Sequence, residues 1–71
     1  MISERLERLI EEMVDRSVRF EDAVREFEKR FIVRVLGQSN SSLKKTADAL
    51  GIHRNTLSRK MAEYKIRKRA T

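Results

Sequence analysis

The sequence predicts an all-α protein with four helices, in which an N-terminal helical pair precedes a C-terminal helix-turn-helix. The 71 residues include no Pro and only two Gly, and 39% of them are charged and 39% hydrophobic, which is typical of amphipathic helices. Apolar residues recur every three or four positions along most of the chain. Near the C-terminus, Gly51 separates two short apolar stretches, as the turn of a helix-turn-helix requires.

The first helix is predicted over residues 3–16 and the second over residues 20–36, because large apolar side chains repeat at helical spacing in both segments. Gly37 follows the second helix directly. We expect Gly37 to end that helix, since glycine adopts the left-handed conformation that closes many helices.

A chain of 71 residues is small enough that its source of stability has to be identified. A core of this size supplies only roughly 3–5 kcal/mol, and small domains often depend on disulfides, metal or a partner chain. The sequence has no Cys and a single His, which excludes disulfides and leaves no ligand set for structural zinc. Oligomerisation is the remaining source of stability.

The two N-terminal apolar stripes therefore have two interpretations. They could form a simple intramolecular core, or they could serve as a dimerisation hairpin that pairs with a second copy into a four-helix bundle of two-fold symmetry. We favour the homodimer, because these faces are too large for one small chain to cover. The residues expected at its interface are Leu6, Leu9, Ile10, Met13, Val14, Phe20, Val24, Phe27 and Phe31.

The C-terminal part is expected to contain a polar loop, a helix over residues 42–50 capped by Ser41 or Ser42, the Gly51 turn and a last helix over residues 54–65. His53 is expected to cap the last helix. The core of this part is predicted to contain Leu50, Ile52, Leu57, Met61 and Tyr64. One compact domain is thus divided into dimerisation helices (1–37), a helix-turn-helix (38–66) and a basic tail (67–71).

Charge separates the two halves of the chain. Residues 1–36 contain nine acidic and eight basic residues, whereas residues 37–71 contain two acidic and nine basic residues. A half so rich in Lys and Arg is typical of a protein that binds a polyanion, and double-stranded DNA is the partner that fits a helix-turn-helix.

The side chains expected to contact DNA lie at the starts of the two C-terminal helices. In a helix-turn-helix the first residues of the second helix face base edges in the major groove, where an Arg fork can bind guanine O6 and N7. The base-contacting candidates are Arg54, Asn55, Thr56 and Arg59, and the phosphate-contacting candidates are Ser42, Lys44, Lys45, His53 and Lys60. We expect no catalytic, cofactor or metal site and no enzyme activity, because no acid–base pair, nucleophile–base set or phosphate loop is present.

The motif itself is specific. It comprises Thr46-Ala47, Leu50-Gly51-Ile52, Arg54, Thr56-Leu57, Lys60-Met61 and Tyr64-Lys65-Ile66, and it resembles the Fis family, including the C-terminal DNA-binding domains of NtrC-type enhancer-binding activators. The resemblance implies a Fis-type helix-turn-helix, a groove-facing set of Arg54, Thr56 and Arg59, and DNA bending. Lys65 stands where the family usually has Gly, so the last helix is expected to run on past this point. Residues 1–24 carry no assignable motif.

The function predicted from the sequence is that of a homodimeric, sequence-selective transcription regulator in the bacterial nucleoid. An activator protein or the transcription machinery is a further expected partner. Two alternatives stay open: a nucleoid-associated architectural protein that bends DNA, and a dimerisation or recruitment module with secondary DNA binding. No apolar run reaches the roughly 18 residues of a membrane span, and no signal-like segment follows Met1, so a soluble cytoplasmic protein is expected.

Overall fold

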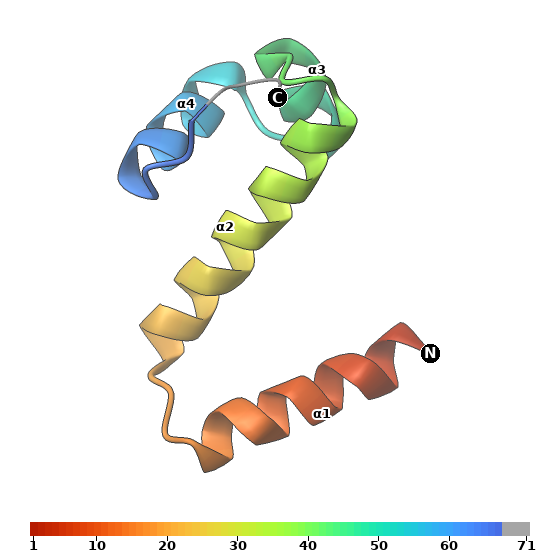
Figure 1. The fold of residues 1–71 in the computed structure, drawn as a ribbon, viewed down its shortest axis with the longest axis vertical. Helices are drawn as coiled ribbons and strands as arrows, with labels where there is room; N and C mark the ends of the chain where they lie inside the picture. Colours follow the sequence, from red (N-terminus) through yellow and green to blue (C-terminus); the bar gives the residue numbers. More distant parts are fainter. Residues whose placement is uncertain (68–71) are drawn as a thin grey trace.

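The computed structural model describes residues 1–67, which form four helices and no strand (Figure 1). The helices are α1 (Ile2–Asp15), α2 (Phe20–Gln38), α3 (Leu43–Leu50) and α4 (Arg54–Glu63). The predicted all-α fold of four helices is confirmed. The basic tail expected at residues 67–71 lies, except for Arg67, outside the described residues.

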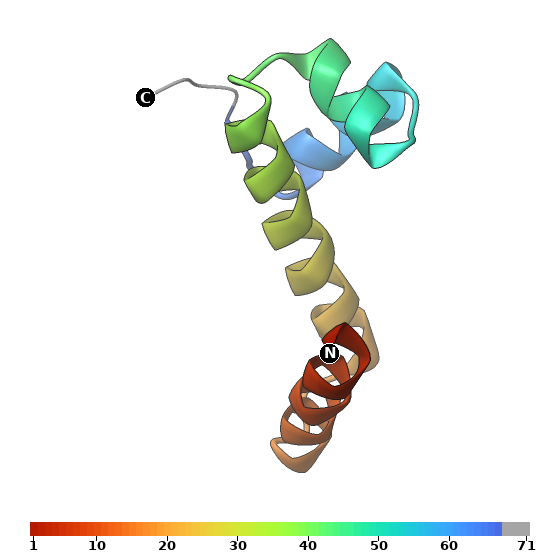
Figure 2. The ribbon, with the colours of Figure 1, turned by 90° about the vertical axis from the view of Figure 1, so that its right-hand side faces the viewer.

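Helix α2 connects the two ends of the molecule. Figure 1 shows α3 and α4 gathered at its C-terminal end, while α1 leaves its N-terminal end at an open angle. In the turned view of Figure 2, α1 again lies beyond the end of α2 that is far from α3 and α4. No helix among the described residues is long and apolar enough to cross a membrane.

The buried core lies at the junction of α2, α3 and α4. Around it pack half-buried apolar side chains that include Leu50, Ile52 and Tyr64. The five residues that the sequence assigns to this core are therefore confirmed, two as buried and three at its edge. The buried apolar residues are Ile32, Leu36, Ala47, Leu57 and Met61.

The N-terminal apolar stripes are exposed in the single chain. Helix α1 has no buried residue. Among the residues expected at a dimer interface, Met13 is half-buried, and the other eight are exposed by fractions that range from 38% at Val24 to 83% at Phe20. One chain thus does not build an intramolecular core from these side chains.

Local signals place α3 as predicted. The Ser42 side chain caps it, with Oγ accepting a hydrogen bond from the Lys45 N–H at 3.2 Å. Thr46 is fully buried, and its hydroxyl donates to the Ser42 carbonyl at 2.7 Å, so the polar group is satisfied. Gly51 ends the helix with a φ of 74°, the left-handed conformation in which glycine carries no Cβ penalty.

The end of α2 differs from the prediction. Gly37 does not end the helix, because α2 continues through Gln38. The chain reverses instead at Asn40 and Ser41, whose φ angles are 53° and 62°. The Ser41 N–H donates to the Leu36 carbonyl at 2.9 Å, which satisfies an acceptor at the helix end. Asparagine tolerates the left-handed region through its short polar side chain, so the reversal does not require the glycine.

The end of α4 also differs. The helix stops at Glu63 rather than running on, and Lys65 adopts a left-handed φ of 57°. The Ile66 N–H then donates to the Met61 carbonyl at 2.8 Å, which is the hydrogen bond between residues five positions apart that closes a helix end in a Schellman motif. Lysine therefore makes the turn that glycine usually makes, and Ile66 packs against the core.

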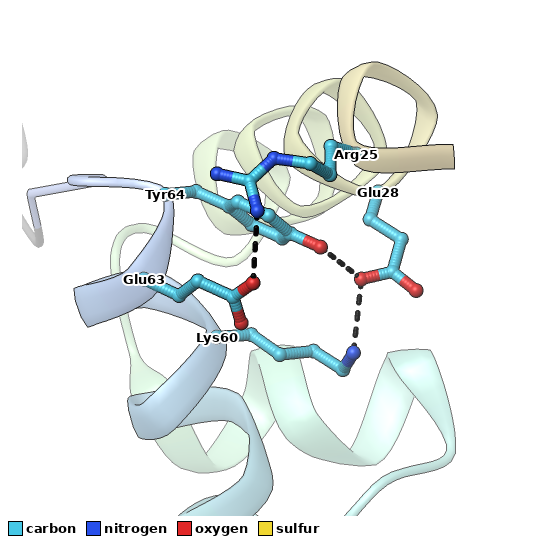
Figure 3. Close-up of polar contacts among 5 residues, drawn as sticks. All are labelled: Arg25, Glu28, Lys60, Glu63 and Tyr64. Atoms are coloured by element: carbon cyan, nitrogen blue, oxygen red, sulfur yellow. Dashed lines mark hydrogen bonds and ion pairs between the residues drawn. The ribbon is translucent and has the colours of Figure 1, made fainter. Parts of the chain in front are cut away.

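Five side chains form a second contact between α2 and α4, which we call the α2–α4 polar cluster (Figure 3). Glu28 Oε1 accepts hydrogen bonds from Lys60 Nζ at 2.9 Å and from Tyr64 Oη at 2.5 Å. Arg25 Nη1 pairs with Glu63 Oε2 at 3.3 Å, and the guanidinium carbon of Arg25 lies 5.6 Å from the centre of the Tyr64 ring. These contacts join residues that are more than 30 positions apart in the sequence.

The hydrogen bond between Tyr64 and Glu28 shifts the pKa values of the two groups in opposite directions. The hydrogen bond from Tyr64, together with the Lys60 contact, lowers the pKa of Glu28 because both stabilise its carboxylate form. The same hydrogen bond to Glu28, together with partial desolvation, raises the pKa of Tyr64 to about 12. Both shifts mean that the folded state favours a neutral phenol beside an ionised carboxylate.

Replacing Lys65 by glycine should stabilise the protein. A residue with a Cβ pays roughly 1–2 kcal/mol in the left-handed conformation, and the gain should be about 1 kcal/mol or less because glycine has a more flexible unfolded state. Urea midpoints at fixed protein concentration measure the change. Gly51→Ala is the matched control: it should destabilise, because its φ is 74° although no atom lies within 4 Å of an added Cβ. A lower midpoint for Lys65→Gly would contradict the strain argument.

The Tyr64–Glu28 hydrogen bond should make stability fall at high pH. The folded-state pKa of Tyr64 lies above its usual value of 10, so its contribution is complete below pH 10 and is lost as the pH rises toward about 12. The difference in unfolding free energy between the wild type and Tyr64→Phe should therefore shrink between pH 10 and pH 12. Denaturant unfolding of both proteins across this range tests the prediction, and a constant difference would contradict it.

Candidate nucleic-acid interface

Helix α4 presents a polar face because its apolar residues are used for packing. Leu57 and Met61 point into the core, which is one face of the helix. With 3.6 residues per turn, Asn55 and Arg59 fall on the other side, whereas Arg54, three residues before Leu57, lies at the edge of the core face; all three are exposed. Asn55 and Arg59 therefore share one accessible face, and Arg54 is accessible beside it in the first turn of the helix.

Thr56 occupies an intermediate position. It is half-buried and lies in the first turn of α4, between the buried Leu57 and the exposed Asn55. Its side chain is thus at the flank of the surface rather than at its centre. Only a group that comes close to the start of the helix could contact it.

The start of α4 is held by His53. The ring Nδ1 accepts a hydrogen bond from the Asn55 N–H at 3.0 Å, so this histidine caps the helix as predicted. Within residues 1–67, no group of three or more His, Cys, Asp or Glu side chains is placed to hold a metal ion. The contact that the structure shows for this imidazole is thus with the helix start beside Arg54.

A second polar group surrounds the start of α3. Lys44 and Lys45 lie in its first turn and are exposed, whereas the Ser42 hydroxyl is half-buried and accepts the capping hydrogen bond. The remaining N–H groups of this turn and the two ammonium groups give this end of the helix a positive character. The predicted phosphate-contacting residues therefore do not form one cluster: three lie at α3, and His53 and Lys60 belong to α4.

The cations differ in whether they are already paired. Lys44, Lys45, Arg54 and Arg59 form no ion pair with any carboxylate of the described residues. Lys60 differs, since its ammonium is bound to Glu28 and about two thirds of its side chain is covered. Four unpaired cations on α3 and α4 are consistent with the predicted polyanion surface.

The sequence prediction omitted two features of this surface. Ser58 is an exposed polar residue one helical turn after Arg54, and the i,i+4 spacing alone would have placed it on the same face. The pairing of Glu28 with Lys60 could not be recognised from spacing in the sequence. The contact crosses 32 positions of sequence and depends on how two helices pack.

A comparison with protein families supports the interpretation. A family model described as "Bacterial regulatory protein, Fis family" matches residues 23–64, more than half of the chain. No curated protein and no solved structure matches the chain. The matched segment begins within α2 and ends at Tyr64, so it includes the part of α2 that supplies two of the five buried core residues as well as both helices of the motif. The chain therefore belongs to the Fis family of bacterial regulatory proteins, and α3 and α4 form its DNA-binding helix-turn-helix.

Proposed function

We propose that the protein is a homodimeric, sequence-selective regulator of transcription that inserts α4 into the major groove of DNA. The observation that carries this proposal is the exposed N-terminal part of α4, where Asn55 and Arg59 share one face, Arg54 lies at its edge, and no carboxylate neutralises either arginine. Such a face at the start of the second helix is where a helix-turn-helix contacts base edges.

Each side chain of this face suits a different contact. Arg54 is in the first turn and can bind guanine O6 and N7 through its fork, while Asn55 can pair with adenine. Thr56, at the flank, suits a thymine methyl or a phosphate oxygen. Arg59 lies one turn further along and can reach a base or the backbone.

The start of α3 would hold the sugar–phosphate backbone. Lys44 and Lys45 supply positive charge there, and the Ser42 cap fixes the first turn of α3. His53, the cap of α4, would add a phosphate contact at the start of that helix. Contacts of this kind set the register of a protein on DNA without selecting its sequence. Lys60 is less available for such a contact, because its ammonium already donates to Glu28 and its charge is paired there.

The exposed apolar stripes support a dimer. On α2, Phe20, Val24, Phe27 and Phe31 follow a spacing of four, three and four residues, the pattern of a helix seam that packs against other helices. The Phe27 and Phe31 rings already contact each other, with centroids 5.4 Å apart and planes tilted by 51°. Burial against a second copy would remove this surface from water, at roughly 25 cal/mol per Å² of apolar area.

A two-fold dimer would present two copies of α4 to successive major grooves, roughly 34 Å apart on straight DNA. A shorter separation would require bent DNA, as the likeness to Fis implies. Such a regulator would act in the nucleoid of the bacterial cytoplasm, with an activator protein or the transcription machinery as further partners.

Arg54→Ala should weaken binding to the preferred site by about 1–3 kcal/mol and relax base preference at one position of each half-site. Selection from random DNA with the wild type defines the site, and titrations of both proteins against substituted half-sites measure the loss. An unchanged base preference would contradict a base-contacting role for Arg54. Selection of A-tracts without a half-site motif would instead indicate an architectural DNA-bending protein.

Phe27→Asp should convert the protein to a monomer, because it buries a carboxylate in the proposed interface. Val33→Asp is the matched control: Val33 is similarly exposed (48%, against 57% for Phe27) and lies on α2 but outside the stripe. Sedimentation equilibrium of the three proteins measures the association constant. A wild type that sediments as a monomer, or an equal effect of both substitutions, would contradict the proposed interface.

A further inference from the structure

We propose that Glu28 and Tyr64 are positioning residues: through the α2–α4 polar cluster they fix the direction in which α4 projects from α2. This inference rests on the proposed function for its consequence, since the direction of α4 sets how the two recognition helices of a dimer are spaced. The claim about the orientation itself concerns one chain and can be tested without DNA.

The apolar core brings α4 to α2 without fully orienting it. Leu57 and Met61 of α4 join Ile32 and Leu36 of α2 in the core. Apolar burial is non-directional, so it rewards contact over a range of helix directions. A second, directional contact is needed to select one of them.

The polar cluster supplies this contact toward the C-terminal end of α4, where Lys60 precedes the core residue Met61 and Tyr64 follows it. Lys60 and Tyr64 lie in and just after the last turns of α4, and both donate to the same oxygen of Glu28. Glu28 lies one helical turn before the core residue Ile32 on α2. On α2 the polar contact lies one turn before the apolar one, and its hydrogen bonds are directional, so together the two contacts restrict the axis of α4 more than the core does alone.

A change in the direction of α4 would displace its DNA-contacting N-terminal end. Arg54 and Asn55 lie at the N-terminal end of α4, before the buried Leu57, whereas Tyr64 follows the last turn. A displacement at Tyr64 would therefore move these side chains in the opposite direction. In a dimer the effect would occur twice, once for each copy of α4.

The Glu28–Lys60 pair differs from an ordinary surface pair, and the chain offers a direct comparison. Glu26 and Arg30 also pair at 2.9 Å, but their side chains are 53% and 81% exposed and both belong to α2. The side chains of Glu28 and Lys60 are only 32% and 31% exposed, and they join two helices. Only the second pair can orient one helix against another.

The pair also assigns Lys60 a role other than phosphate binding. Its ammonium is held by a carboxylate of α2, on the side of α4 that faces the body of the protein (Figure 3). Lys60→Met should then lower DNA affinity without changing how affinity depends on salt. Loss of a phosphate contact would lower the salt slope by about one unit, and that result would return Lys60 to the phosphate-binding set.

Distance measurements between spin labels on α2 and α4 test the orientation directly. The sequence has no Cys, so Glu21→Cys and Ser58→Cys provide two unique labelling sites at exposed positions. Labelled protein diluted into an excess of unlabelled protein limits the signal to pairs within one chain. We expect one narrow distance distribution in the otherwise unchanged protein and a broadened or shifted one in Glu28→Ala/Tyr64→Phe.

The control for this experiment is Glu26→Gln, which removes a pair of the same length within α2 and should leave the distribution unchanged. Circular dichroism establishes that each variant retains its helices. If the double variant loses helicity, Tyr64→Phe alone, which deletes one hydroxyl group, is measured against the same criterion. A folded variant with the distance distribution of the parent protein would overturn the proposal.

The consequence for DNA is tested with paired half-sites at varied separations. The wild type should bind one separation best, and the cluster variant should bind neighbouring separations with affinity ratios closer to one, while its half-site sequence stays the same. An unchanged ratio would overturn the effect on spacing. If the wild type selects no half-site motif at all, the proposed function fails, whereas the distance measurement still decides whether the cluster orients α4.

Discussion

The arrangement of this protein depends on the packing of two α4 side chains, Leu57 and Met61, with the end of α2. Leu57 is completely buried, and with its neighbours it forms the only fully enclosed apolar region among the described residues. Because one face of a short helix is committed to this contact, the opposite face is left to solvent. The polar surface of α4 is thus a direct consequence of how the core is built, and the Fis-family match includes both sides of that contact.

How much of this the sequence could predict depended on the range of the interaction. The caps at Ser42 and His53 and the turn at Gly51 were predicted correctly, because each involves residues within a few positions of one another. The helix ends at Gly37 and Lys65 were predicted wrongly. A glycine permits a left-handed turn without imposing one, and a lysine can be held in that conformation when the following residue gains a packing site.

The polar cluster could not be predicted, because nothing in the local pattern relates Glu28 to residues 32 and 36 positions later. Its acceptor oxygen receives both donors only once α2 and α4 have crossed at the observed place. The same limit applies to the side-chain roles on α4. Spacing indicated which residues share a face, but the pairing state of Lys60 required the fold.

The exposed stripe on α1 has a consequence for the amount of protein in a cell. An isolated helix of about 14 residues is only marginally stable in water, and no residue of α1 is fully buried within its own chain. In the proposed dimer, α1 would gain packing contacts, and with them stability, as partner molecules become abundant. The fraction of dimeric, DNA-binding protein would then rise more steeply than the rate of synthesis. At low concentration the monomers, whose α1 stripe is uncovered, would be degraded by proteases more readily than dimers.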